Sequence, residues 1–88
     1  MPKFIAAHTL PFTEEQFMAQ SKDLVSKHKP PKGYNWKLTQ CAFGDHKFFC
    51  EWEAPNKEGL EAYFKEIKMP FDAVYPVKTF DVAKGKLQ

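Results

Sequence analysis

Two predicted strands and the turn that joins them lie in residues 34–55, YNWKLTQCAFGDHKFFCEWEAP. Bulky apolar residues alternate with polar ones on both sides of Gly44-Asp45, a dipeptide typical of tight turns. We therefore expect one strand over 34–43 and a return strand over 46–54, which Pro55 ends. The segment predicts an antiparallel hairpin.

The length of this turn decides which residues of the hairpin face each other. A two-residue turn would place Cys41 opposite Phe48 and Thr39 opposite Cys50, so that both thiols share one sheet face. Their Cα atoms would be roughly 7–8 Å apart, which is long for a disulfide but suits two ligands of one metal. A three-residue turn would put the thiols on opposite faces. Both registers are open from the sequence.

The elements before the hairpin are a strand and a helix. The first strand is expected over 3–10, an apolar segment bounded by prolines. The run Thr13-Glu-Glu-Gln16 is a capping box and predicts a helix start, because each of its end side chains can bond a free backbone N–H. The helix should end before Pro30-Pro31, with one face formed by Phe17, Ser21, Leu24, Val25 and His28.

The elements after the hairpin are a second helix and a last strand. Asn56 is expected to cap the helix, whose core face recurs at three- and four-residue spacing as Leu60, Tyr63, Phe64 and Ile67. A strand is predicted over 74–82, at a sheet edge because Pro76 cannot donate a backbone hydrogen bond. Residues 83–88 are expected to be a loose tail.

The predicted order of elements is βαββαβ, which is typical of the ferredoxin-like fold. Right-handed crossovers would place both helices on one face of a four-stranded antiparallel sheet with strand order 4-1-3-2. Such an α+β domain leaves its other sheet face uncovered. This open face must contact solvent, a ligand or a second sheet.

Length and composition fit one domain over residues 1–88. Hydrophobic residues make up 43% and aromatic residues 16% of the chain, which suggests that a partner covers some of them. We expect a homodimer through the open sheet face, with a well-packed monomer as the alternative.

The net charge is +2, and Lys and Glu are interspersed without a basic block, so no nucleic-acid partner is predicted. No apolar run approaches membrane-spanning length, and no signal-peptide pattern is present, so no membrane partner is predicted. We expect a cytoplasmic protein whose two cysteines stay reduced.

Candidate metal ligands gather in the predicted strand over 46–54 and in its neighbour. Cys50 lies beside Glu51 and Glu53, and His8 lies in the first strand, which should pair with this one. Soft and borderline metal ions favour thiolate and imidazole ligands. Because side chains alternate along a strand, a site that uses Cys50 with Glu53 would need a bent strand or residues from different subunits.

Each candidate also has a structural interpretation. Buried cysteines are usually small hydrophobic residues, which is the alternative for Cys41 and Cys50. His8 can be a hydrogen-bonded core residue. His46 beside the turn is expected to be solvated, and His28 to interact with the helix dipole. No nucleophile motif or glycine-rich phosphate loop is present, so no enzyme activity is assigned.

The chain resembles a small family of bacterial and archaeal proteins that includes a nickel-binding, dimeric ferredoxin-like protein. The resemblance covers about residues 3–78 and rests on three segments, of which the second is the most specific: FIAAH at 4–8, FCEWEAP at 49–55 and PFDAVYPV at 70–77.

This resemblance implies that His8, Cys50 and Glu53 contact a metal, Ni²⁺ or another divalent transition ion. It also implies a dimer formed by two uncovered sheet faces, as in the dimeric α/β barrel superfamily. Thr9 and the segment 68–71 stand where the resemblance would imply further histidines.

Two functions from different classes follow. The first is a small metal-binding dimer that sequesters or senses nickel, copper or zinc without turnover. The alternative is a small-molecule binding module or cofactor-free enzyme of the barrel type, with a pocket lined by Trp36, Phe48, Phe49 and Trp52. A plain scaffold, with the sheet face serving only as an interface, is a third.

Overall fold

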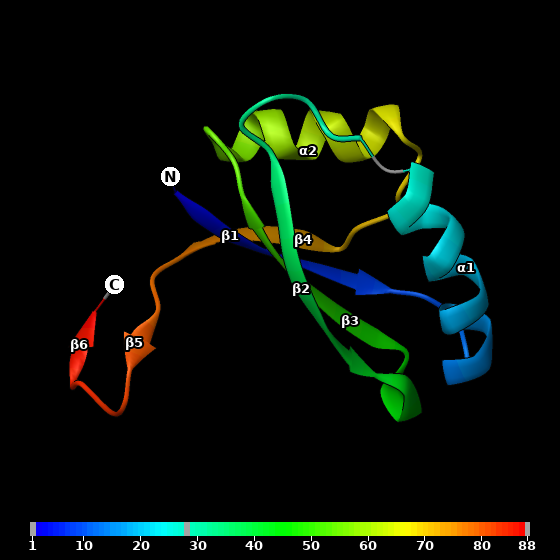
Figure 1. The fold of residues 1–88 in the computed structure, drawn as a ribbon, viewed down its shortest axis with the longest axis horizontal. Helices are drawn as coiled ribbons and strands as arrows, with labels where there is room; N and C mark the ends of the chain where they lie inside the picture. Colours follow the sequence, from blue (N-terminus) through cyan, green and yellow to red (C-terminus); the bar gives the residue numbers. More distant parts are fainter. Residues whose placement is uncertain (1, 28, 88) are drawn as a thin grey trace.

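The structure is a computed structural model that describes residues 2–27 and 29–87 (Figure 1). Its elements in chain order are β1 (Lys3–Thr9), α1 (Glu14–Lys27), β2 (Asn35–Ala42), the short 3₁₀ turn η1 (Phe43–Asp45), β3 (Lys47–Glu53), α2 (Lys57–Glu66), β4 (Ala73–Val77), β5 (Phe80–Asp81) and β6 (Lys86–Leu87). None of the helices in the described ranges has the length and apolar character needed to cross a membrane.

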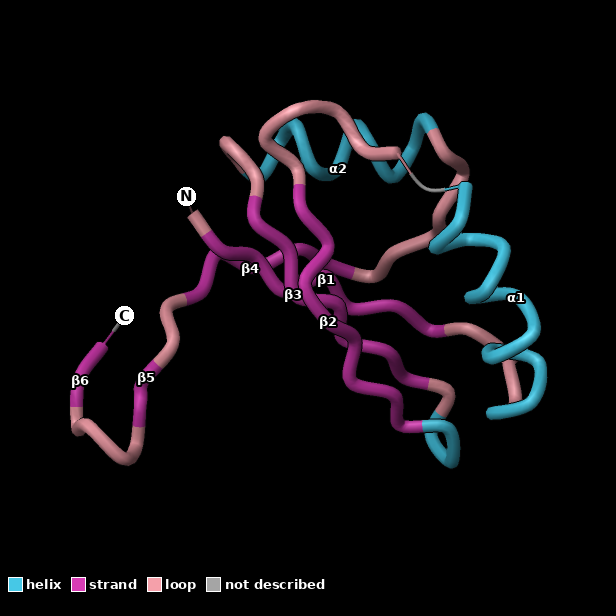
Figure 2. The backbone as a smooth tube through the Cα atoms, viewed as in Figure 1, coloured by secondary structure: helices cyan, strands magenta, loops and turns pink. Residues whose placement is uncertain are grey.

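The first four strands form one antiparallel sheet in the order β2-β3-β1-β4, which confirms the predicted order 4-1-3-2. Figure 2 shows these strands together, with α2 running across them. Strand β4 pairs with β1 alone and lies at the sheet edge, as Pro76 predicts. The fold is α+β, with β1 and β3 at the centre of the sheet.

The register of the β2–β3 hairpin is the one expected for a two-residue turn. Cys41 pairs with Phe48 and Thr39 with Cys50, so both thiols are on one face. The chain reverses through η1, and His46 adopts the left-handed conformation with φ of 56°. Both cysteines are free thiols.

Alternation along the strands divides the sheet into two faces. The face under α2, called here the covered face, holds most of the core, with buried side chains from β1, β3 and β4: Phe4, Ala6, His8, Phe48, Trp52 and Val74. The open face carries the side chains between them. The interior therefore lies between the sheet and α2.

Helix α2 begins where the sequence predicts. The Asn56 side chain accepts a hydrogen bond from the Gly59 N–H at 2.6 Å. Leu60, Tyr63 and Phe64 are buried, as expected from their spacing. Ile67 was expected in the core, and this is wrong: it caps the C-terminal end of α2 and is 39% exposed. The helix ends there because the chain turns through Lys68, whose φ is 59°.

Helix α1 differs from α2 in how it contacts the sheet. Its capping box forms as predicted: Thr13 N–H donates to the Gln16 side chain, and Gln16 N–H donates to the Thr13 hydroxyl. Phe17 stacks on Phe48 of the covered face at 5.3 Å between ring centroids. Val25, predicted on the apolar face, is 64% exposed, so that prediction is wrong.

The position of α1 explains this exposure. Figure 1 shows the helix beyond the end of the sheet rather than across it, and Phe17 in its first turn packs on Phe48 of the covered face. Of the other predicted face residues, Ser21 is half-buried. His28 and the side chain of Leu24 lie outside what the structure describes.

The C-terminal segment also differs from the prediction. The expected strand over 74–82 ends at Val77, and the expected loose tail folds back as the small hairpin of β5 and β6. The turn is local: the Asp81 carboxylate accepts from the Lys84 N–H, and the Gly85 N–H donates to the Asp81 carbonyl at 2.7 Å. Gly85 has φ of 63°, a conformation that glycine adopts without strain.

We expect Asn56→Ala to lower the free energy of unfolding by about 1 kcal/mol, because the Gly59 N–H loses its partner at the start of α2. Urea unfolding followed by circular dichroism measures this change. The matched control is Asn35→Ala, an exposed asparagine of β2, which should stay within about 0.5 kcal/mol of the wild type. Equal losses in the two variants would contradict the capping role.

Candidate functional site

His8 is the buried polar residue of the covered face, at 2% exposure. Its Nδ1 lies 2.6 Å from the Pro70 carbonyl oxygen. Because a carbonyl only accepts, Nδ1 carries the hydrogen, and in the neutral ring Nε2 keeps its lone pair. The edge-to-face contact with Phe64, at 5.5 Å between centroids, also fixes the ring. The hydrogen-bonded core interpretation is confirmed, and it leaves one nitrogen available as a ligand.

Cys50 is held by a chain of hydrogen bonds on the same face. The Thr39 hydroxyl donates to Cys50 Sγ at 3.1 Å, and Trp36 Nε1 donates to that hydroxyl at 2.8 Å. The indole N–H can only donate, so it sets the direction of this series of hydrogen bonds. The hydroxyl hydrogen is directed at the sulfur, which acts as acceptor. This hydrogen bond stabilises the thiolate of Cys50, the form that binds metals.

Burial of Cys50 has the opposite effect on its pKa. Desolvation raises the pKa of the Cys50 thiol, the Thr39 hydrogen bond lowers it, and nearby Cys41 adds a smaller rise. Burial also raises the pKa of Cys41. The net direction is upward, so both thiols hold their protons at neutral pH. A metal that binds Cys50 must therefore displace its proton.

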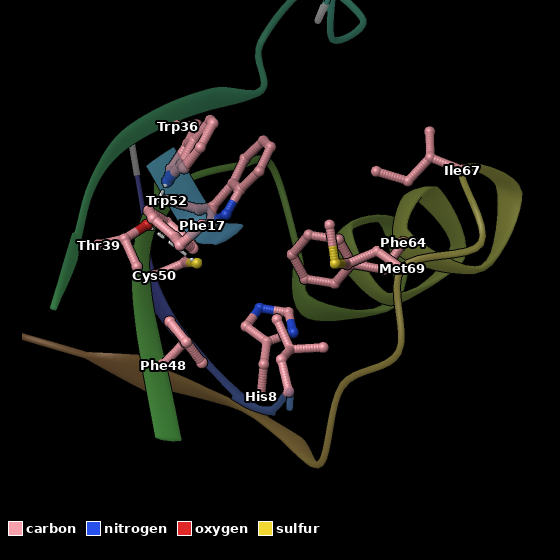
Figure 3. Close-up of a pocket in the computed structure, with 11 residues that line it drawn as sticks. His8, Phe17, Trp36, Thr39, Phe48, Cys50, Trp52, Phe64, Ile67 and Met69 are labelled. Atoms are coloured by element: carbon pink, nitrogen blue, oxygen red, sulfur yellow. Dashed lines mark hydrogen bonds between the residues drawn. The ribbon is translucent and has the colours of Figure 1, made fainter. Parts of the chain in front are cut away.

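The two candidate ligands border one small, partly open cavity of about 50 Å³ on the covered face. Figure 3 shows the His8 ring and Cys50 Sγ turned into this space. The register makes them diagonal neighbours, since Ala6 pairs with Cys50 and His8 pairs with Phe48. Their Cα atoms are thus roughly 7–8 Å apart. The other walls are mostly apolar: Leu10, Phe17, Trp36, Thr39, Phe48, Trp52, Phe64, Ile67 and Met69.

The third expected ligand lies elsewhere. Glu53 is on the open face, where its carboxylate is 3.3 Å from Lys37 Nζ. The sheet separates it from His8 and Cys50, so the structure does not bring the three residues together. Within residues 2–27 and 29–87, no group of three His, Cys, Asp or Glu side chains is placed to hold a metal ion. One chain thus offers two soft donors, and this set falls short of a complete nickel site.

The expected aromatic pocket forms in part. Trp36, Phe48 and Trp52 line the interior cavity, while Phe49 is 39% exposed on the open face. Pockets for organic ligands are usually about 300–1,000 Å³. A cavity of about 50 Å³ admits only a few waters or an ion, so this aromatic-lined cavity is too small for such a ligand.

Two features of the site were missed from the sequence. The Pro70 carbonyl that orients His8 is 62 residues away in the chain, and no local signal marks it. Thr39 had a signal, because the two-residue-turn register already placed it opposite Cys50. His46, expected to be solvated, is exposed.

Comparison with known protein families gives a match over most of the chain. A family model described as "Nickel responsive protein SCO4226-like" matches residues 4–77. No curated protein and no solved structure matches the chain. The matched range includes both helices and the four-stranded sheet except Lys3, the first residue of β1, and it ends at the last residue of β4.

We expect Thr39→Val to lower the free energy of unfolding by about 1–3 kcal/mol, because it removes the acceptor of Trp36 Nε1 and the donor to Cys50 Sγ. Urea unfolding measures the loss. Thr39→Ser keeps the hydroxyl and should retain most of the stability. Equal stability of the valine variant and the wild type would contradict the hydrogen-bond chain.

The raised pKa of Cys50 predicts a pH dependence of stability. The folded state holds the thiol proton more tightly than the unfolded chain, so this contribution is complete below the ordinary thiol pKa of about 8.5 and is lost as pH rises through the raised value. In a Cys41→Ser background, the free energy of unfolding should fall more steeply above about pH 8.5 with Cys50 than with Cys50→Ala. Parallel pH profiles of the proteins with Cys50 and with Cys50→Ala would contradict this prediction.

Proposed function

We propose that this chain, which belongs to the SCO4226-like family of nickel responsive proteins, is a cytoplasmic homodimer that binds nickel or another divalent transition ion without catalysing a reaction. The observation that carries the proposal is the pair formed by His8 and Cys50. They lie on adjacent strands, border one cavity, and have hydrogen-bond partners that leave a ring nitrogen and a sulfur facing inward.

The chemistry of this pair suits borderline and soft ions. Imidazole nitrogen and thiolate bind nickel, copper and zinc well, while oxygen-preferring ions favour carboxylates. The Pro70 and Thr39 contacts act as the outer partners that orient metal ligands in known sites. With two protein donors, the ion would retain water or another small ligand. Such a site would bind reversibly, as a response to metal concentration requires.

A homodimer through the open sheet face is the second part of the proposal. The centre of that face carries apolar side chains from all four strands: Ile5, Ala7, Leu38, Phe49, Ala73 and Tyr75. Leu38 is 45% and Tyr75 is 55% exposed in the single chain. The ion pairs Lys37–Glu53 and Lys47–Asp72 lie at its two ends. An apolar centre with a charged rim is typical of a protein interface.

We expect the wild-type protein to bind nickel in calorimetric titration and to show a thiolate-to-metal absorption band. Cys50→Ala should abolish the band, and both this variant and His8→Ala should weaken nickel affinity at least tenfold, because each removes one of two donors. Copper and zinc, titrated in the same way, establish the order of preference.

The controls separate the site from its surroundings. Cys41→Ala removes the other thiol and should leave affinity within twofold of the wild type. Glu53→Gln should also have no effect if the metal lies in the interior, and a loss of affinity in this variant alone would move the site to the open face. Absence of nickel, copper and zinc binding by the wild type would end the proposal.

A further inference from the structure

Met69 is a further residue with a metal-binding atom at the cavity that His8 and Cys50 border. Its side chain is half-buried and packs against the core of the covered face. Figure 3 shows Cys50 and Met69 on opposite sides of the His8 ring, with all three side chains turned toward the cavity. A thioether sulfur binds soft metal ions without losing a proton. Because methionine has three rotatable bonds, this sulfur can approach an ion held by the other two residues.

The turn that ends α2 fixes the position of Met69. The Met69 N–H donates to the Phe64 carbonyl at 2.8 Å, and the Lys68 N–H donates to the Lys65 carbonyl at 3.2 Å, which together form a Schellman motif. Lys68 takes the left-handed conformation that this motif requires. The motif turns the next residue back toward the helix, so Met69 joins Phe64 in lining the cavity. The same turn places, one residue later, the carbonyl that orients His8.

The charge of the cavity favours a monovalent ion. Among the described residues that line it, none is Asp, Glu, Lys or Arg. Cys50 loses its proton when a metal binds, so the site contributes one negative charge. A monovalent ion makes the complex neutral, whereas a divalent ion leaves a positive charge in apolar surroundings, which is costly. Glu53, the carboxylate expected to compensate that charge, lies on the open face beside Lys37.

The type of donor favours the same ion. A thiolate, a thioether and an imidazole make a set dominated by sulfur, and thiolate and thioether ligands select Cu⁺. Ni²⁺ favours square-planar or tetragonal sites built from nitrogen and oxygen. A cavity of about 50 Å³ has little room for the waters that would complete such a shell. Cu⁺ accepts low coordination numbers, so the protein donors alone are enough for it.

We propose that Met69 is a metal ligand and that the cavity binds Cu⁺, through His8 Nε2, Cys50 Sγ and Met69 Sδ, more tightly than it binds Ni²⁺. Binding releases the Cys50 proton to solvent and forms a bond between the sulfur and the metal. No electron is transferred, because the copper enters as Cu⁺. The inference rests on the metal site of the proposed function and changes the ion that this site prefers.

Titration of the full chain with Cu⁺ tests the preference, without oxygen and in competition with a chromogenic chelator of Cu⁺. The wild type should bind Cu⁺ at least a hundredfold more tightly than Ni²⁺. Met69→Leu conserves volume and apolar packing, so it should keep the wild-type circular dichroism spectrum. It should weaken Cu⁺ binding at least tenfold and change Ni²⁺ binding less than twofold, because only Cu⁺ favours the thioether. The matched control Met18→Leu, at a 53% exposed position of α1, should change neither affinity.

X-ray absorption at the copper edge identifies the ligands directly. The wild-type complex should show two sulfur neighbours and one imidazole nitrogen, and Met69→Leu should show one sulfur neighbour. Unchanged Cu⁺ affinity in Met69→Leu, or a single sulfur neighbour in the wild type, overturns the role of Met69. A wild type that binds Ni²⁺ more tightly than Cu⁺ overturns the inference and leaves the proposed function standing. Absence of binding by Cu⁺ and by the divalent ions overturns both.

Discussion

The alternation of side chains along β3 is the constraint on which the rest of the structure depends. This strand pairs with β1 on one side and β2 on the other, so its register fixes both faces of the sheet. Phe48, Cys50 and Trp52 enter the interior, while Phe49 and Glu51 face outward. A shift by one residue would exchange the two sets and expose the core. The Cys50 thiol and the Glu51 and Glu53 carboxylates therefore lie on opposite faces of the sheet because side chains alternate along β3.

The same register places two polar side chains in the apolar interior. Both His8 and Cys50 lie among aromatic rings, where an unsatisfied polar atom is costly. Each is held by a partner from another element: His8 by the carbonyl before β4, and Cys50 by a hydroxyl on β2. These contacts stabilise the fold whether or not a metal is bound. They also orient the two electron-pair donors, which is why a structural and a ligand role are compatible here.

Local signals predicted the helix starts and the strand order well. The Thr13–Gln16 capping box and the Asn56 cap form as expected, because their partners lie three residues away. Apolar spacing was a weaker guide to burial. Val25 has the right spacing but remains exposed, since α1 lies past the end of the sheet. Spacing shows which face of a helix is apolar, while the path of the connecting loop decides whether that face meets the core.

The sequence by itself determined the order of elements from β1 to β4, the hairpin pairing once the turn length was known, and the division of Cys50 from Glu53, because each depends on residues close in the chain. Only the tertiary structure decided that His8 bonds Pro70, that Thr39 and Trp36 hold Cys50, and that one chain supplies two soft donors. The physical reason is that these contacts join separate elements. Their formation depends on packing distances and on burial, which no short segment encodes.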